Sequence, residues 1–144
     1  KLESAAQMGA DKTLNSTGGE AVAETLKEAT DNKLFAVLDT FGSEHTGALA
    51  VSALAKAGRY VVVGQHGGDF KMPQIWLPQK AMTVRGSHVG NSGHLRTLID
   101  MYRQGKLKAI PVETRPLDQV NEAIAELESG KVLGRIVFEP TKGV

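Results

Sequence analysis

The sequence predicts an α/β protein with a doubly wound, parallel sheet, and two observations carry this prediction. Short apolar runs rich in β-branched residues alternate with amphipathic helical patterns, an order typical of parallel strands joined by crossover helices. Two of these runs, residues 59–64 and 82–90, end in glycines. Open α/β sheets bind ligands at the carboxyl ends of their strands, where a glycine lets bare backbone approach a flat or charged molecule. The chain therefore resembles part of a nucleotide-binding domain.

The composition indicates one globular domain of 144 residues, with 41% hydrophobic residues and a formal net charge of +1. The 17 basic residues are interleaved with 16 acidic ones, which excludes the concentrated basic face that nucleic-acid binding requires. No apolar run approaches the roughly 20 residues of a membrane span, so no membrane partner is expected. Without cysteine, the chain can form neither disulfides nor thiolate metal sites, and a cytoplasmic location is expected.

The first 63 residues alternate helix and strand signals. Residues 1–8 have helical spacing but no preceding capping residue, so we expect the chain to begin inside a helix, with further sequence upstream. The elements expected next are a short strand over 12–15, an amphipathic helix over 19–30 with Val22, Leu26 and Ala29 inward, an apolar strand over 34–39, a turn over 40–43, a helix over 44–56 that ends before Gly58, and a strand over 59–63.

The second half continues the alternation after a long loop. Residues 65–79 contain several glycines and prolines and the sole tryptophan, which indicates an irregular, functional or interfacial loop. The elements expected after it are a strand over 81–85, a helix capped by Asn91 or Ser92 and running to Gln104 with Leu95, Leu98, Ile99 and Tyr102 inward, an extended segment over 110–114, a helix from Asp118 to Leu127, and a strand over 135–138.

Seven short segments, spread over nearly the whole chain, keep the order and spacing of one known family: residues 1–11, 37–42, 58–64, 85–87, 105–108, 116–123 and 129–137. In these segments the chain resembles the zinc-type alcohol dehydrogenases of the medium-chain dehydrogenase/reductase superfamily. The resemblance implies a nicotinamide dinucleotide, NAD or NADP, lying across the carboxyl ends of the strands.

The resemblance also implies which residues contact the cofactor. Thr40 and Phe41 follow the 34–39 strand and would contact the adenine ribose or the nicotinamide side. The segment Val63, Gly64 and Gln65 would pass beside the nicotinamide ring. Backbone groups of Ser87, His88 and Val89 would hold its carboxamide, and Arg135 would approach the pyrophosphate, a role that suits a guanidinium.

Each of these residues also has a plainer interpretation. Val63 and Gly64 can simply end a core strand, Phe41 can be a core aromatic, and Arg135 can be a solvated surface charge. His88 is a lone loop histidine, and the four histidines, with His45, His66 and His94, lack the paired spacing of a zinc site. No catalytic residue and no metal ligand is predicted in this chain.

The apolar segment over residues 70–78 is either cover for the core or an interface. In the family, this region and the following strand form the contact between subunits, so we expect a homo-oligomer through residues 70–85. Exposed Met72, Ile75, Trp76 and Leu77 would otherwise make a costly apolar patch.

Other parts of the family pattern have no counterpart in the sequence. No Gly-x-Gly-x-x-Gly loop occurs, and the first two strands of the domain and the upstream zinc domain are absent. Residues 1–144 are thus expected to form a Rossmann-like, doubly wound parallel sheet that is incomplete, a partial nicotinamide-dinucleotide-binding domain. In the order 3-2-1-4-5-6 the lost strands lie between residues 12–15 and 34–39, so two sheet edges would be exposed, favouring poor autonomous folding or pairing with another copy.

The expected function is the cofactor-binding portion of an NAD(P)-dependent alcohol or polyol dehydrogenase, in which zinc belongs to the absent domain. This chain alone is expected to be inactive. Two alternatives remain: a zinc-free quinone or enoyl reductase of the same superfamily, and a non-catalytic nucleotide-binding or dimerisation module.

Overall fold

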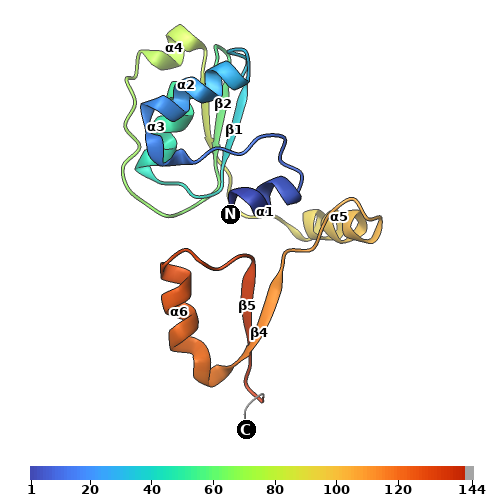
Figure 1. Ribbon diagram of the computed structural model, residues 1–144. Helices are drawn as coiled ribbons and strands as arrows, with labels where there is room; N and C mark the ends of the chain where they lie inside the picture. The colour runs from blue at the N-terminus through green and yellow to red at the C-terminus, as the bar shows by residue number, and fades with distance from the viewer. Residues whose placement is uncertain (142–144) are drawn as a thin grey trace. The chain divides into compact units, whose positions relative to one another are not determined.

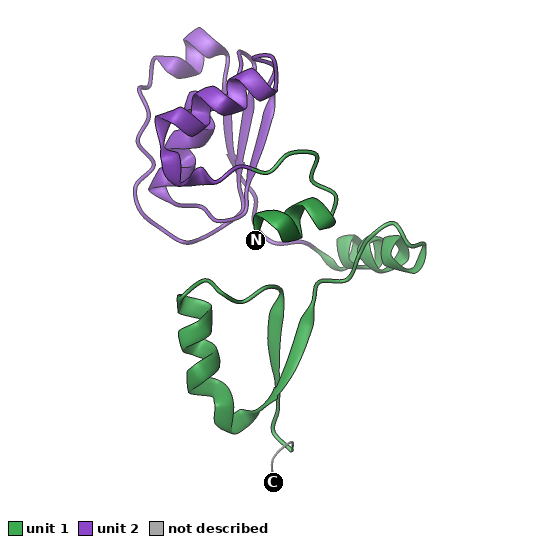
Figure 2. Cartoon of the chain, viewed as in Figure 1, with its two compact units in different colours: residues 1–13, 91–144 green, residues 14–90 purple. Residues whose placement is uncertain are grey.

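The computed structural model describes residues 1–141 and divides the chain into two compact units (Figure 2). Unit 2 spans Leu14–Gly90. Unit 1 combines Lys1–Thr13 with the chain from Asn91 onward. Each unit contains its own parallel sheet, so each is described by itself.

Unit 2 is built on a three-stranded parallel sheet with the order β1-β2-β3. Helix α3 lies over one face of this sheet and packs against β1, and α2 packs against α3 (Figure 1). The elements are η1 (Ser16–Gly18), α2 (Glu20–Ala29), β1 (Ala36–Asp39), α3 (Glu44–Ala53), β2 (Arg59–Val62), α4 (Trp76–Lys80) and β3 (Thr83–Gly86).

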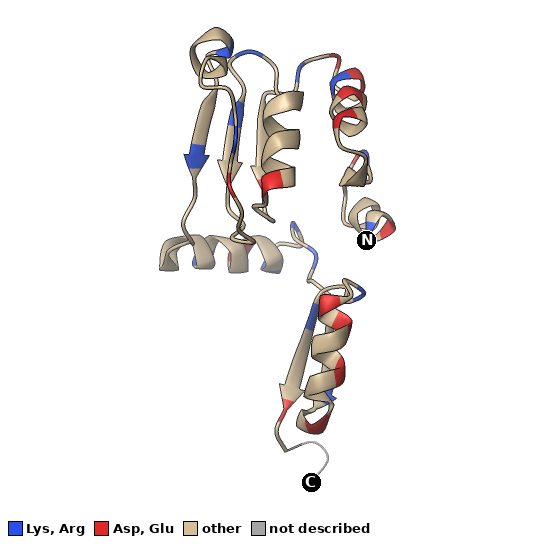
Figure 3. Ribbon diagram, turned by 90° about the vertical axis from the view of Figure 1, so that its left-hand side faces the viewer, with Lys and Arg blue, Asp and Glu red and all other residues tan. Residues whose placement is uncertain are grey.

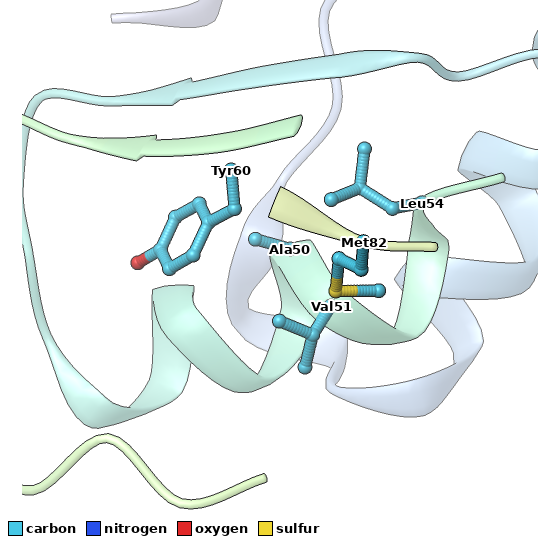
Figure 4. Close-up of a cluster of buried hydrophobic side chains, with 5 residues drawn as sticks. All are labelled: Ala50, Val51, Leu54, Tyr60 and Met82. Atoms are coloured by element: carbon cyan, nitrogen blue, oxygen red, sulfur yellow. The ribbon is translucent and has the colours of Figure 1, made fainter. Parts of the chain in front are cut away.

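The core of unit 2 lies between this sheet and α3. Figure 4 shows the cluster, in which the Tyr60 ring of β2 lies among side chains of α3 and the start of the β3 segment. Its members are Ala50, Val51, Leu54, Tyr60 and Met82. Small side chains on α3 let the helix approach the sheet: a Cβ on Gly47 would crowd the Phe70 ring and the Tyr60 hydroxyl.

Unit 1 contains a second parallel pair, β4 and β5, joined through α6. Its elements are α1 (Leu2–Gln7), α5 (Ser92–Arg103), β4 (Val112–Pro116), η2 (Leu117–Gln119), α6 (Val120–Glu128) and β5 (Arg135–Glu139). Arg115 ties β4 to α6, because its guanidinium donates to Glu113 of the same strand and to Glu126 of the helix. Basic and acidic residues are interspersed along the chain (Figure 3).

The prediction of an α/β fold with parallel strands is confirmed, and most elements form within a few residues of their expected bounds. The expected strand over residues 12–15 is wrong. That segment is irregular, and Asn15 instead caps η1 by accepting a hydrogen bond from the Thr17 amide. A short extended segment forms a strand only where a neighbouring strand satisfies its backbone groups, and none of the described strands pairs with residues 12–15.

One expectation about packing is also wrong, and for residues 70–78 the structure supports core cover, one of the two alternatives, at three of four apolar side chains. The apolar stripe of α5 is exposed, with Leu95 at 59% and Tyr102 at 56%, because nothing described in unit 1 covers it. Conversely, the loop over 65–79 ends in helix α4, whose Trp76 and Leu77 pack, with Met72, against the core of unit 2. Of the four side chains expected in an exposed patch, Ile75 is the one that is exposed, at 57%.

Within the described residues, no helix is both long and apolar enough to cross a membrane.

Candidate functional site

The carboxyl ends of all three strands of unit 2 lie at one edge of the sheet. The strands are parallel, and the register pairs Asp39 with Val62 and Val62 with Gly86. The segments that follow the strands therefore leave the sheet at the same edge, as the glycine-ended runs predicted. This sheet edge, formed by residues 39–43, 62–67 and 86–89, is the candidate site.

The first segment is a tight turn held by the side chain of Asp39. Its Oδ1 accepts hydrogen bonds from the backbone amides of Phe41 and Gly42, both at 2.9 Å. Gly42 has φ +74°, a conformation that an L side chain rarely adopts. Ser43 then caps α3 through a reciprocal pair of hydrogen bonds with Thr46.

The turn after β1 and the segment after β2 are joined through their backbones. The Asp39 carbonyl accepts from the amides of Val63 (2.8 Å) and Gly64 (3.0 Å), and the His66 amide donates to the Phe41 carbonyl at 3.0 Å. A Cβ on Gly64 would overlap the Phe41 backbone. Glycine is therefore needed at position 64 so that the two backbone segments can touch. The sequence had suggested a different reason, the approach of a ligand to bare backbone.

Two aromatic rings stack on this paired backbone. The Phe41 and His66 ring centroids are 4.2 Å apart, with an interplanar angle of 23°. The Phe41 side chain is 53% exposed, so it is not the core aromatic of the plainer interpretation. The pair presents a flat surface, apolar at the Phe41 ring and weakly polar at the His66 ring, of the kind on which planar ring systems bind.

The third segment leaves open space at the end of β3. The Ser87 amide donates to the Val62 carbonyl at 2.8 Å, which holds the segment beside β2. A Cβ on Gly86 would meet no atom within 4 Å. Val89 is 76% exposed and has φ +31°. The backbone at this end of the sheet is accessible to a ligand.

Eight of the nine predicted site residues belong to these three segments: Thr40, Phe41, Val63, Gly64, Gln65, Ser87, His88 and Val89. The ninth, Arg135, begins β5 in unit 1, where its Nη1 donates to the Gly134 carbonyl. Its contact with a cofactor stays a prediction, as do the individual contacts of the other eight.

The sequence interpretation missed the buried pair beneath the site. The Tyr60 hydroxyl donates to Asp39 Oδ2 at 2.8 Å, and the two residues are 2% and 6% exposed. Burial would raise the pKa of Asp39, but hydrogen bonds from Thr46, Gly42, Tyr60 and Phe41 outweigh it and lower this pKa. Burial and the Asp39 carboxylate raise the pKa of Tyr60. The available signal was an aspartate ending an apolar strand directly before a glycine-containing turn.

Two histidines have local structural partners. A ring nitrogen of His45 contacts the Ser16 carbonyl, and His94 completes the cap of α5 with Asn91. Within residues 1–141, no group of three or more His, Asp or Glu side chains gathers in a way that could hold a metal ion. The described residues therefore do not fit zinc.

Known proteins with similar sequences and structures include dehydrogenases. A family model described as zinc-binding dehydrogenase matches residues 8–138. An NAD-dependent alcohol dehydrogenase of Sulfurisphaera tokodaii is 34% identical over 139 residues, covering 96% of this chain and 40% of that protein. An alcohol dehydrogenase of Moraxella sp. is 32% identical over 141 residues, covering 98% of this chain and 41% of its own length.

Solved structures give the same result. The crystal structure of the alcohol dehydrogenase of Aeropyrum pernix superposes with a TM-score of 0.86 and 31% identity, covering 96% of this chain and 40% of that one. The chain thus spans about two fifths of the length of the relatives it matches.

Proposed function

Since this chain belongs to the zinc-binding dehydrogenase family, we propose that it supplies the nicotinamide side of the NAD site of an alcohol dehydrogenase. The names of its relatives support NAD as the dinucleotide. On this proposal, residues 1–144 are one part of a nicotinamide-dinucleotide-binding domain, since the relatives are about two and a half times as long as the matched region.

The observation that carries the proposal is the edge of unit 2 at which three strand ends meet. It offers what a dinucleotide needs: accessible backbone, open space above Gly86 and the exposed Phe41–His66 ring pair. A nicotinamide ring is flat and carries an amide, which backbone amide and carbonyl groups can orient at little entropic cost.

The role of these residues is to bind and orient. NAD, when bound, supplies the chemistry of an alcohol dehydrogenase by accepting a hydride. Residues 63–65 would lie beside the ring, residues 87–89 would hold the carboxamide, and the Phe41–His66 pair would exclude water from one side. Zinc and the substrate pocket would come from other parts of the enzyme, and this chain alone would not turn over an alcohol.

The proposal is tested with the two halves of the cofactor. We expect nicotinamide mononucleotide, added to the ¹⁵N-labelled chain, to shift the amide signals of residues 40–42, 63–66 and 86–89. Adenosine monophosphate should shift them less. Shifts confined to α2 and α3, or equal shifts with both ligands, would contradict the proposal.

A glycine variant tests the position of the ring. Gly86→Ala adds a methyl group in open space, so folding should be unaffected while nicotinamide mononucleotide binds more weakly. The thermal midpoint measured alongside the titration is the control. Unchanged binding by this variant would place the ring elsewhere.

We also propose a homo-oligomer formed through residues 70–85. Strand β3 is the last strand of its sheet within the described residues, all four of its residues are exposed, and Ile75 is exposed nearby. Unpaired strand edges recruit a second strand. Ile75→Glu should shift the mass measured by size exclusion with light scattering toward the monomer. Leu127→Glu, at an exposed apolar side chain of α6 in the other unit, is the matched control and should not.

The expected cytoplasmic location is kept as part of this proposal, supported by the absence of cysteine, and cell fractionation tests it.

A further inference from the structure

We propose that Asp39 is a positioning residue for the site: its buried carboxylate fixes the turn that carries Phe41 and thereby sets the Phe41–His66 ring pair. The inference rests on the proposed function for what the rings bind. It concerns a residue that neither the predicted site nor the family match assigns.

Asp39 is the one charged side chain that is buried within residues 1–141. Removing a carboxylate from water is costly unless hydrogen bonds replace the lost solvation. Aspartate is also an unusual residue for the end of an apolar strand, where an aliphatic side chain would pack without this cost. Its presence therefore indicates a specific structural role that offsets this cost.

The geometry around the carboxylate points to that role. Oδ1 accepts from the amides of Phe41 and Gly42, so it defines the turn, and Oδ2 accepts from the Tyr60 hydroxyl. Tyr60 is anchored in the core cluster with Val51 and Leu54 (Figure 4). The carboxylate thus connects a rigid core residue to a surface turn.

The effect extends to the neighbouring segment. Once the turn is fixed, the Phe41 carbonyl accepts from the His66 amide and the Gly42 carbonyl accepts from the Gly67 amide, at 3.0 and 3.1 Å. These two bonds hold His66 in register with Phe41, which places the rings 4.2 Å apart. One buried side chain therefore determines the geometry of two exposed rings that it does not contact.

Three variants separate positioning from general stability. Asp39→Leu keeps the volume but removes both acceptors. Asp39→Asn keeps an acceptor for the two amides and can donate its NH₂ group to the Tyr60 oxygen. Val51→Ala, in the same core but without a bond to the turn, is the control for loss of stability.

The first measurement is amide hydrogen exchange, which needs no ligand. In Asp39→Leu we expect protection to fall at Phe41, Gly42, His66 and Gly67, and to persist at Val63, whose amide bonds to the backbone carbonyl of residue 39. Asp39→Asn should restore the protection. A Leu variant with wild-type protection at Phe41 and Gly42 would overturn the proposal.

The second measurement is the affinity for nicotinamide mononucleotide. Asp39→Leu leaves the Phe41 and Gly42 amides and the Tyr60 hydroxyl without their acceptor, so the turn should loosen and binding should weaken by about tenfold or more. Asp39→Asn and Val51→Ala should stay within about threefold of wild type. Equal losses in Asp39→Leu and Val51→Ala, or no rescue by Asn, would overturn the positioning role. If the wild-type chain binds no mononucleotide, the proposed function is wrong, while the exchange result still supports or refutes the role of Asp39.

Discussion

Gly64 shows what a single residue decides at this site. It lies where the segment after β2 meets the turn after β1, and a Cβ there would overlap the Phe41 backbone. Backbone cannot move aside as the tip of a flexible side chain can. The same residue type at Gly86 faces open space, so two glycines that look alike in the sequence have different physical reasons.

This difference gives a prediction at the residue scale. Gly64→Ala should lower the free energy of unfolding by about 1–3 kcal/mol, the usual cost of forcing atoms into a filled space. Gly86→Ala is the matched control and should change it by no more than about 0.5 kcal/mol. Urea denaturation measures both. Similar losses in the two variants would show that the close contact at Gly64 is not what requires glycine.

Helix α3 illustrates how an element is positioned from its first residue. The Ser43 side chain accepts from the Thr46 amide while the Thr46 hydroxyl accepts from the Ser43 amide, a complete capping box directly after the Gly42 turn. The cap fixes where the helix begins and therefore where the site turn ends.

The corresponding prediction concerns this cap. Ser43→Ala should lower the free energy of unfolding by about 1 kcal/mol, because the Thr46 amide loses its acceptor. Ser43→Asn retains a capping oxygen and should stay close to wild type. Thermal unfolding followed by circular dichroism compares the two. An Asn variant as unstable as the Ala variant would mean that the cap is not the source of the effect.

Elements also show where sequence patterns were informative and where they were not. The three strands of unit 2 were predictable because each lies in an apolar or β-branched run of its own. Residues 12–15 have a weaker pattern, with one apolar and one β-branched residue, and no described strand lies beside them, so Asn15 forms a local cap instead. The apolar stripe of α5 predicted an inner face, which is wrong for this chain, because the structure leaves Leu95 and Tyr102 exposed.

At the scale of the whole molecule, stability should fall in acid for reasons that lie in both units. Hydrogen bonds to Arg115 lower the pKa of Glu113 and Glu126 below the ordinary 4.5, and the pKa of Asp39 is lowered below 3.8. A carboxyl group whose pKa is lower in the folded state than in the unfolded chain stabilises the fold at every pH above its unfolded-state pKa. This stabilisation is lost as the pH falls from the unfolded-state pKa through the folded-state pKa. Stability should therefore be steady above about pH 5 and decline below it.

Urea titrations from pH 7 to pH 3 measure this dependence. Glu126→Gln should reduce the loss of stability that begins near pH 4.5, the ordinary pKa of a glutamate. Asp39→Asn should reduce the further loss below pH 3.8. A decline that neither variant alters would mean that other carboxylates dominate.

The distribution of the core predicts a second whole-molecule property. Within the described residues, eight of the nine buried hydrophobic side chains belong to unit 2, and Ala123 is the one in unit 1. Because burial of apolar surface is the main stabilising contribution, amides of β2 and α3 should exchange more slowly than those of β4 and α6. Hydrogen exchange followed by mass spectrometry tests this, and equal protection of α3 and α6 would contradict it.

By itself, the sequence determined the α/β class, the parallel direction of the strands, and eight predicted site residues that lie together at one sheet edge. These could be read from the sequence because hydrophobic periodicity, glycines and helix caps are local properties of the chain. It could not reveal the Tyr60–Asp39 hydrogen bond, the stacking of Phe41 on His66, or that residues 12–15 form no strand. Those were decided by the tertiary structure, since a hydrogen bond across 21 residues or a missing neighbouring strand exists only once distant segments have been brought together.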